Sequence, residues 1–238
     1  TKSKMRNIQS NQRDQHHIFF WDTETTGLFR YDSPPAIINL AVCDAESKDG
    51  VQWFVNPRGV HIQRKAEEVH GISAKQVADC PDFEHTFKEL LKWVNARCRK
   101  GATPVLCGYN SKAFDNLVLL AECKRFSLNA GMFLFADLLP HLRKRKTTRS
   151  GLSLLEDQLE MAGNRKLGTI YQVLFGSPLD GAHSALADAQ ALARVWSVVA
   201  RHHPDFQLPT IDAEAAQGAR WKDIRPHAPD AAPPARDV

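Results

Sequence analysis

The sequence predicts an α/β fold in which a mixed sheet is flanked by helices. Three stretches with strand-like patterning come first, at His17–Asp22, Ala36–Asp44 and Val51–Asn56, and the Gly, Pro and Asp residues between them indicate turns. Beyond residue 80, strand-like and helix-like stretches alternate. Three strands in succession, followed by alternating strands and helices, are typical of a mixed sheet covered by helices.

The spacing of apolar residues defines each later element. In the stretch Phe83–Cys98, apolar residues recur at intervals of three or four, which predicts an amphipathic helix. The two later strands are expected at Pro104–Tyr109 and Met132–Asp137. The remaining helices are expected at about Ala113–Phe126, Leu138–Leu142, Leu152–Met161, Gly168–Leu174 and Ser184–His202.

Length and composition bound the class of protein. The 238 residues fit one domain with short extensions, and a hydrophobic content of 43% is ample for a packed core. The net charge of +4 suits a polyanionic partner without proving one. The five cysteines include no CxxC pair, which predicts reduced thiols and an intracellular protein, with cytoplasm, nucleus and organelle left open. No apolar run reaches about 18 residues, which argues against a membrane span.

The polar and proline-rich ends set the expected domain boundaries. Residues 1–15 are basic and polar and are expected to form a flexible arm. Residues 16–206 carry the strand-like and helix-like patterns and are expected to form the folded domain. Residues 207–238 end in an Ala/Pro-rich stretch that cannot form a core, so they are expected to be a flexible tail.

A pair of acidic residues closes the first expected strand. Asp22 and Glu24 are two positions apart, and residues two apart in a strand face the same side. Two carboxylates in this arrangement can hold one divalent cation or share two. The segment Asp-Thr-Glu-Thr-Thr-Gly is also compatible with an ordinary surface turn, so the pair alone does not decide between these interpretations.

Two further acidic sites lie at the beginnings of expected helices. Asp115 stands in a first helical turn, where an acid also serves as an ordinary N-terminal cap. Asp188 lies on an apolar helix face, where a carboxylate is costly without a partner, whether a metal ion, a lysine or an arginine. His183 precedes that helix on an expected loop, as a candidate base or as an exposed bystander. Carboxylates from three stretches, with a histidine, form the set that metal-dependent phosphodiester cleavage requires.

Three motifs carry a resemblance to a known family. DTETTGL (22–28), NSKAFD (110–115) and GAHSALADA (181–189) resemble the three exonuclease motifs of the DnaQ-like, DEDDh 3′→5′ exonuclease superfamily, including its TREX and proofreading-subunit branches. Further matches to the same superfamily are Asn56-Pro57, VHGIS (69–73) and LGTIY (167–171). The resemblance covers about residues 16–203. It implies a ribonuclease H-like fold, which is a five-stranded mixed sheet with its first three strands antiparallel, flanked by helices.

The resemblance implies a two-metal hydrolytic site. Position by position, the carboxylates of Asp22, Glu24, Asp115 and Asp188 would bind two Mg²⁺ or Mn²⁺ ions. His183 would act as the general base, a role that suits its unperturbed pKa of about 6.5. The implied activity releases nucleoside 5′-monophosphates, one at a time, from the 3′ end of single-stranded DNA or RNA. Without metal the carboxylates would repel one another, so partial protonation or disorder is expected.

Substrate contacts are expected in the loop after the first strand. The resemblance implies that the backbone of Thr25 and Thr26 holds the terminal nucleotide and that Leu28 wedges against its base. Phe29 and Tyr31 are candidates for base stacking, which contributes about 1–3 kcal/mol per base. The alternative for Phe29 is a hydrophobic contact beneath the loop.

Candidate contacts outside this loop are fewer. Asn110 either orients the scissile phosphate or closes a turn, and His70 is expected to be a structural hydrogen-bonding residue. The densest basic cluster is a candidate phosphate-binding patch, a localisation signal or a solvated loop. Its residues are Arg143, Lys144, Arg145 and Lys146.

Other functions stay open on the sequence alone. The main alternative is a catalytically silent nucleic-acid-binding module, or a proofreading or scaffold subunit of a larger complex. An endonuclease of the ribonuclease H type shares the fold, but that type lacks the HxxxxD arrangement and the TTG loop. The sequence leaves open a preference for DNA or RNA, and an association as a homodimer or with a polymerase, and it predicts no membrane partner.

Overall fold

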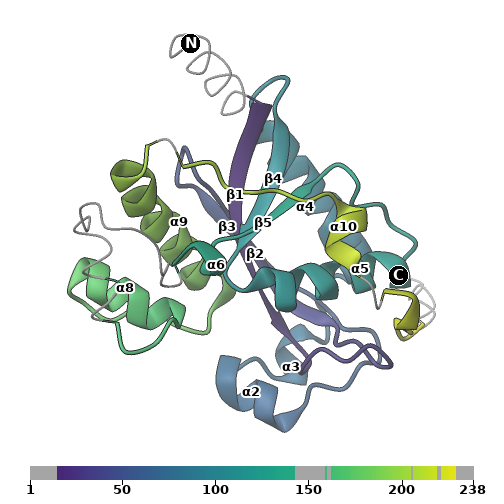
Figure 1. Cartoon of the computed structure of the whole chain (residues 1–238). Coiled ribbons are helices and arrows are strands. Elements are labelled where there is room, and N and C mark those ends of the chain that lie inside the picture. Colours follow the sequence, from purple (N-terminus) through teal and green to yellow (C-terminus); the bar gives the residue numbers. More distant parts are fainter. Residues whose placement is uncertain (1–14, 143–158, 160–161, 205, 219–220, 229–238) are drawn as a thin grey trace.

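A five-stranded mixed sheet forms the centre of the molecule (Figure 1). The computed structural model describes residues 15–142, 159, 162–204, 206–218 and 221–228. In the sheet order β3-β2-β1-β4-β5, the strands are β3 Gly50–Phe54, β2 Ile37–Asp44, β1 His16–Thr25, β4 Thr103–Gly108 and β5 Leu134–Asp137. The pairs β1–β2 and β2–β3 are antiparallel, whereas β1–β4 and β4–β5 are parallel. This sheet confirms the expected ribonuclease H-like architecture.

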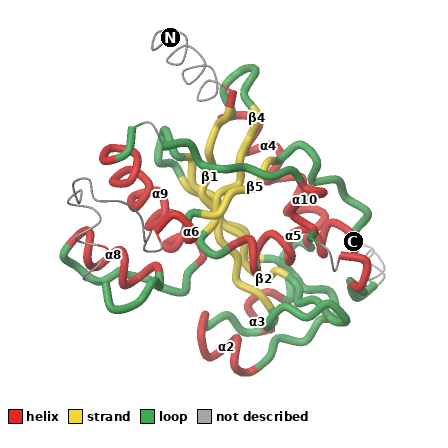
Figure 2. Tube along the Cα trace, in the orientation of Figure 1, coloured by secondary structure: helices red, strands yellow, loops and turns green. Residues whose placement is uncertain are grey.

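Helices cover both faces of the sheet, and Figure 2 shows the strands lying between them. Helices α8 (Leu167–Phe175) and α9 (Ala185–His202) share a hydrophobic core with one face. Helices α4 (Phe83–Arg97), α5 (Asp115–Arg125) and α10 (Ala213–Gln217) share a core with the other face. The smaller elements are α2 Arg64–His70, α3 Ala74–Val77, α6 Leu139–Leu142 and the 3₁₀ turns η1 Ser111–Ala113 and η2 Trp221–Asp223.

Alternation along β1 assigns its side chains to these two cores. Phe20 packs on the α9 side, whereas Phe19 and Trp21 pack on the α4–α5 side. This nearly continuous apolar run is typical of a strand that helices cover on both faces. Because successive side chains of a strand face opposite ways, Asp22 and Glu24 continue on the α9 side. The strand therefore delivers both carboxylates to the face that α8 and α9 cover.

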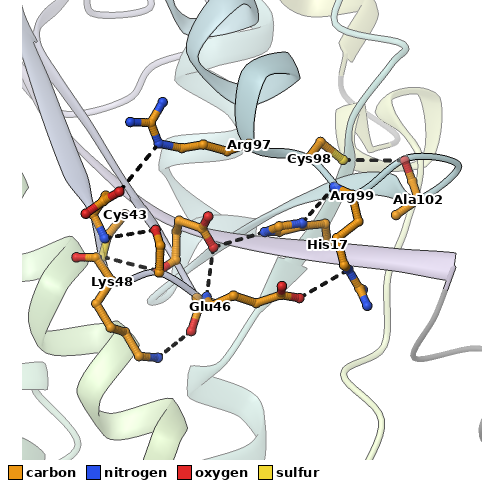
Figure 3. Close-up of polar contacts among 12 residues, drawn as sticks. His17, Cys43, Glu46, Lys48, Arg97, Cys98, Arg99 and Ala102 are labelled. Carbon is orange, nitrogen blue, oxygen red and sulfur yellow. Dashed lines mark hydrogen bonds and ion pairs between the residues drawn. The ribbon is translucent and has the colours of Figure 1, made fainter.

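A polar network around the buried His17 anchors the other end of β1 (Figure 3). The Nε2 atom of His17 lies 2.9 Å from Asp44 Oδ1, and the Nδ1 atom of the same ring accepts a hydrogen bond from the backbone N–H of Arg99 at 3.0 Å. These two contacts set the neutral tautomer that carries its proton on Nε2. Arg99 Nε lies 3.2 Å from Glu46 Oε1, and the His17 ring stacks on Phe19 with centroids 4.6 Å apart. The network ties the beginning of β1 to β2 and to the segment after α4.

Helices α2, α3 and α10 were not among the expected elements, and one expectation needs correction. Helix α2 has no buried residue and α3 buries only Val77, so neither carries the apolar stripe that predicts a helix. The flexible tail expected from residue 207 does not hold for the described part of that segment. There, Ile211 exchanges backbone hydrogen bonds of 2.7 and 2.9 Å with Phe135 of β5, and Ala216 and Ile224 are buried. These contacts make the segment part of the folded domain.

Other expectations fall on residues that the structure does not describe. Three expected segments lie outside the described residues: residues 1–14 of the arm expected at 1–15, the last residues 229–238 and, apart from Leu159, the helix expected at Leu152–Met161. Within the described ranges, none of the helices has both the length and the hydrophobicity that crossing a bilayer requires.

Candidate active site

Three carboxylates from two elements converge on the α9 side of the sheet. Asp22 and Glu24 lie on β1, opposite Ala41 and Asn39 of β2, and Asp188 lies in the first turn of α9. One carboxylate oxygen from each of the three lies within 4.8 Å of the others. Oxygen ligands this close together suit a hard divalent cation such as Mg²⁺. The group of three is therefore the candidate metal site.

Small side chains allow α9 to bring Asp188 to this position. Ala185, Ala189 and Ala193 are four residues apart and buried, so they form one face of the helix against the sheet. Alanine occupies little volume, which permits close approach of the helix to β1 and β2. Asp188 precedes one of these alanines and is half-buried at the edge of the contact. The apolar helix face that the sequence indicates around Asp188 is therefore present.

Burial and mutual repulsion raise the pKa of these carboxyls. Burial, followed by the charges of Asp188 and Asp115, raises the pKa of Glu24 to about 8. Burial and the charges of Asp115, Asp188 and Glu24 hold the pKa of Asp22 well above its usual value. Burial also raises the pKa of Asp188, against the effect of a hydrogen bond from the His183 backbone. A cation favours the ionised form of all three, so the donor set fits a bound divalent metal.

The fourth expected carboxylate, Asp115, stands beside this group. It is buried at the beginning of α5, where its Oδ1 accepts a 2.6 Å hydrogen bond from the Thr23 hydroxyl. Burial raises the pKa of Asp115 to about 6, and the Thr23 hydrogen bond acts in the opposite direction. Asp115 is not among the three residues whose oxygens lie within 4.8 Å. Its charge nevertheless contributes to the raised pKa values of Asp22 and Glu24, which places it within electrostatic reach.

Asp137 organises the loop that leads to Asp115, a role that the sequence analysis misses. Its Oδ1 accepts the backbone N–H of Asn110 at 2.8 Å, and its Oδ2 accepts that of Lys112 at 3.1 Å. Asn110 adopts a left-handed conformation with φ 63°, so it closes a turn there. One feature of the sequence could have identified Asp137: it is the last residue of β5, a strand that runs parallel to β4. Residues that follow parallel neighbouring strands meet at one edge of a sheet.

His183 lies on the loop before α9 and lines an open cavity. Its backbone has a left-handed φ of 66°, and its N–H donates to Asp188 Oδ2 at 3.1 Å. The cavity has a volume of about 660 Å³, and Asp22 and Asp188 line it together with the exposed His183. This volume falls within the range of about 300–1,000 Å³ that is usual for small-molecule sites. A titratable imidazole and two carboxylates thus share one solvent-accessible space.

The loop after β1 is held by hydrogen bonds of its own. Thr25 Oγ1 donates to the carbonyl of Gly27 at 2.8 Å, and Thr26 Oγ1 accepts the backbone N–H of the residue before β2 at 3.0 Å. A Cβ on Gly27 would lie 2.4 Å from the end of the exposed Gln63 side chain, which would have to move aside. Leu28 is 78% exposed. Thr25 and Thr26 are buried with their hydroxyls engaged, and the backbone N–H and carbonyl of Thr26 bond to Ala36 and Gln63, so Leu28 is the part of the loop that faces outward.

The neighbouring aromatic and histidine residues support this loop. Phe29 meets Tyr31 edge to face at 5.3 Å between centroids and packs against the α4–α5 core. This is the hydrophobic contact beneath the loop that was the alternative to base stacking by Phe29. The Nε2 atom of His70 lies 3.2 Å from the carbonyl of Thr25, and its Nδ1 accepts the backbone N–H of Ile72 at 3.0 Å. His70 is therefore a structural residue. The basic run Arg143–Lys146 lies outside the described residues.

A family model matches the chain across the whole of this site. The family is described as exonuclease (RNase_T), and the match covers residues 19–196, well over half of the chain. The chain belongs to this exonuclease family. The matched range contains the five expected catalytic positions, which are Asp22, Glu24, Asp115, His183 and Asp188. The resemblance to the DnaQ-like, DEDDh superfamily is thereby confirmed, and the chain contains a hydrolytic exonuclease domain.

Individual relatives agree with this assignment. Exonuclease DPD1, chloroplastic/mitochondrial, from Arabidopsis thaliana is 28% identical over 180 residues, which are 74% of this chain and 53% of DPD1. The zinc-bound complex of E. coli exonuclease I with single-stranded DNA gives a TM-score of 0.59 at 18% identity, over 80% of this chain and 41% of that chain. The nuclease domain of 3′hExo, a DEDDh family member bound to rAMP, gives a TM-score of 0.59 at 18% identity. The match covers 81% of this chain and 96% of that domain.

The exonuclease chain spans about half the length of the curated relative that it matches. At 18% identity, the two solved structures show a shared fold. The family assignment rests on the RNase_T match, which includes the whole carboxylate group.

Proposed function

We propose that this chain is a metal-dependent 3′→5′ exonuclease acting on single-stranded DNA or RNA, with nucleoside 5′-monophosphates as products. The observation that carries the proposal is the convergence of Asp22, Glu24 and Asp188, with oxygens within 4.8 Å, beside a cavity that Asp22, Asp188 and His183 line. The nucleic-acid substrate is supported by relatives: E. coli exonuclease I was solved with single-stranded DNA, and the 3′hExo nuclease domain with rAMP.

The carboxylates would hold two divalent cations, Mg²⁺ or Mn²⁺. Asp22, Glu24 and Asp188 would provide most of the ligands, and Asp115 would add its charge from the α5 side. When bound, such cations supply Lewis-acid activation of a phosphodiester and neutralise charge on its oxygens. The protein would contribute by holding these side chains at fixed positions on β1 and α9, so that no rearrangement is needed on binding.

His183 would serve as the general base. Its imidazole would accept the proton of the attacking water, which is the role that histidine most often has in general acid–base catalysis. The hydrogen bond from the His183 backbone N–H to Asp188 Oδ2, at 3.1 Å, fixes the loop beside the carboxylates. Its exposure to the cavity gives water access to the ring.

The loop Thr25–Leu28 would hold the terminal nucleoside. By resemblance to the superfamily, the backbone of Thr25 and Thr26 would contact the sugar, and it would share the groups that Thr26 already engages with Ala36 and Gln63. The exposed Leu28 would pack on the last base, with Phe29 supporting the loop from below. Asn110, which lines the same cavity as the carboxylates, would contact the scissile phosphate.

Cleavage of end-labelled oligonucleotides tests this proposal. Single-stranded DNA and RNA with a 5′ label are incubated with Mg²⁺, and a ladder that shortens from the 3′ end is expected. EDTA and the substitution Asp188→Asn should each remove it. An oligonucleotide blocked by an inverted 3′ nucleotide should persist, because a 3′→5′ enzyme needs a free 3′ end. Internal cuts, or shortening from the 5′ end, would contradict the assignment, and the faster substrate would identify the preferred sugar.

A further inference from the structure

The cavity beside the carboxylates has a basic wall, which Arg165 and Lys166 form. Its lining includes Arg165 and Lys166, which directly precede α8, in addition to Asp22, Asp188 and His183. Arg165 is half-buried and Lys166 is exposed. Among the residues that the structure describes, neither of these two side chains forms an ion pair. Two cationic groups therefore share a cavity with carboxylates and do not pair with them, so an anion in the cavity would meet both groups.

Several contacts hold this wall in place. The hydroxyl of Tyr109, which follows β4, donates to the carbonyl of Arg165 at 2.6 Å. Arg165 Nη1 donates to the carbonyl of Ala162 at 3.0 Å, and the backbone N–H of Lys166 donates to Asn164 Oδ1 at 2.9 Å. The segment before α8 is thus tied to the same sheet edge that carries the catalytic loop after β4.

A cation–aromatic contact fixes α8 against α9. The Arg194 guanidinium of α9 lies over the rings of Tyr171 and Phe175 of α8, at 5.0 and 4.6 Å from their centroids. Arg194 also hydrogen-bonds to the Tyr171 hydroxyl. Because Asp188 lies on the same helix as Arg194, this contact sets the position of the basic wall relative to the carboxylates.

The position of the wall indicates which part of a strand it meets. The residues Thr25–Leu28, which would hold the terminal nucleoside, are not part of the cavity lining. If the scissile phosphate lies over Asp22 and Asp188, the cavity on the α8 side receives the nucleotide on the 5′ side of the cleaved bond. The charged group of that nucleotide is its own 5′ phosphate. A polyanionic strand entering an acidic site requires compensating positive charge there.

We propose that Arg165 and Lys166 bind the second phosphate from the 3′ end of the substrate strand. This inference rests on the proposed function, and it assigns these residues as determinants of substrate length. A substrate that carries this second phosphate should be bound through one more charge-assisted contact than a substrate that ends at the scissile bond. The enzyme should therefore discriminate against a dinucleotide with a free 5′ hydroxyl.

A pair of dinucleotides isolates this contact. One carries a 5′ hydroxyl and the other a 5′ phosphate, so they differ only in the second phosphate. For the wild-type protein, kcat/KM should be about 10-fold or more higher for the phosphorylated form, as expected for a hydrogen-bonded charge contact. In the double substitution Arg165→Gln/Lys166→Gln, this ratio should fall toward one, mainly through KM. The double substitution Lys88→Gln/Lys92→Gln removes the same charge from α4 on the other face and should keep the wild-type ratio.

Binding provides a readout that does not depend on cleavage. Fluorescence anisotropy with a labelled single-stranded 12-mer, in the Asp188→Asn background, gives the salt dependence of affinity. Loss of one phosphate contact should reduce the slope of log K against log salt by about 0.7. Lys166→Gln alone, at an exposed position, should show part of this reduction with an unchanged melting temperature.

The two experiments separate the possible failures. If no oligonucleotide is cleaved, the proposed function fails, and the salt slope alone decides whether the basic wall binds a phosphate. If cleavage proceeds, but the Arg165→Gln/Lys166→Gln protein keeps both the wild-type dinucleotide ratio and the wild-type slope, the inference is overturned while the proposed function stands. An equal fall in the dinucleotide ratio and in the salt slope of the Lys88→Gln/Lys92→Gln protein would also overturn the inference, because net charge would then explain the effect.

Discussion

The hydroxyl of Thr23 donates a 2.6 Å hydrogen bond to Asp115 Oδ1, across 92 positions of sequence. Both side chains are buried. Because β1 side chains alternate, Thr23 faces the α5 side while Asp22 and Glu24 face the α9 side. One strand thus supplies two carboxylates to the metal site from one face and orients a third carboxylate from the other face. Thr23 is a positioning residue for Asp115.

Thr23→Val should weaken divalent-metal binding. Valine keeps the branched shape but removes the donor, so the buried Asp115 carboxylate loses a hydrogen bond that favours its charged form. Hydrogen bonds to charged groups contribute about 1.5–3 kcal/mol, so Mn²⁺ affinity measured by calorimetry should fall by about 10-fold or more. Thr23→Ser retains the hydroxyl and serves as the control. Equal Mn²⁺ affinity in the valine and serine proteins would show that the bond does not support the site.

Asp22→Asn and Asp188→Asn should each reduce hydrolysis by at least about 10³-fold, because each removes a charged ligand from a group of three. Both proteins should stay folded, since asparagine has nearly the shape of aspartate. In EDTA at pH 8, they should melt at a higher temperature than the wild type, because one source of repulsion is gone. Hydrolysis within tenfold of wild type in either protein would remove that residue from the catalytic set.

The metal-free domain should lose stability as pH rises from about 4 to about 8. The pKa values of Asp22 and Glu24 are raised in the folded state, Glu24 to about 8, whereas unfolded carboxyls titrate near pH 4. The folded state then binds more protons than the unfolded state throughout this window, so the free energy of unfolding falls with increasing pH. Each excess proton contributes about 1.4 kcal/mol per pH unit. Saturating Mg²⁺ should flatten the profile by favouring the ionised carboxylates.

Thermal unfolding across this pH range, in EDTA and in Mg²⁺, measures the effect. Burial raises the pKa of Glu122 to about 7, so this residue adds to the same slope. Glu24→Gln isolates the contribution of the site, because it removes the titrating group and leaves Glu122 in place. A metal-free melting temperature that does not fall with pH, or a Glu24→Gln protein with an unchanged slope, would contradict the raised pKa of Glu24.

His183 substitutions should lower the rate without removing the metal site. Loss of the base should reduce kcat by about 10²–10⁴-fold, with Mn²⁺ affinity largely retained. The backbone φ of 66° makes His183→Asn the better variant, because asparagine tolerates the left-handed region that strains alanine. Its bond from the backbone N–H to Asp188 can persist in the variant. An asparagine variant with near wild-type kcat would show that another group accepts the proton.

Much of the fold follows from apolar periodicity, and the exceptions have physical reasons. The run around Phe20 and the spacing in Phe83–Cys98 predict β1 and α4, because both elements bury apolar side chains on the sheet. Helix α2 escapes prediction because it buries none of its residues. The last segment escapes because its contribution depends on a few positions, such as Ile211 and Ile224, that contact distant parts of the chain.

The candidate active site likewise has features that the sequence predicts and features that it does not. The positions of Asp22, Glu24 and Asp188 can be read from strand alternation and from an acid on an apolar helix face. Two other features depend on side-chain directions. They are the hydrogen bond between Thr23 and Asp115 and the hydrogen bonds by which Asp137 holds the loop after β4. Those directions follow from the register of β1, β4 and β5, which joins residues far apart in the sequence.

Removal of the last segment should destabilise the exonuclease domain. Ile211 adds a backbone pairing to β5, the edge strand of the sheet, and Lys124 of α5 binds the carbonyl of the buried Ile224 at 3.0 Å and lies 5.6 Å from the Trp221 ring. Burying a large aliphatic side chain contributes about 1.5–3 kcal/mol. A chain that ends at Leu208 should therefore melt about 10 °C lower, at about 2–4 °C per kcal/mol for a domain of this size.

A chain that ends at residue 228 is the matched control, because it keeps every described contact of the segment. Its melting temperature should equal that of the full chain. Ile224→Ala in the full chain should reproduce part of the loss, by about 2–4 kcal/mol in the free energy of unfolding from denaturant titration. Equal melting temperatures for the chains ending at Leu208 and at residue 228 would show that the segment rests on the surface without stabilising it. A loss confined to the shorter chain would establish that the folded domain extends beyond residue 206, because the edge pairing and the contacts to α5 are then required for stability.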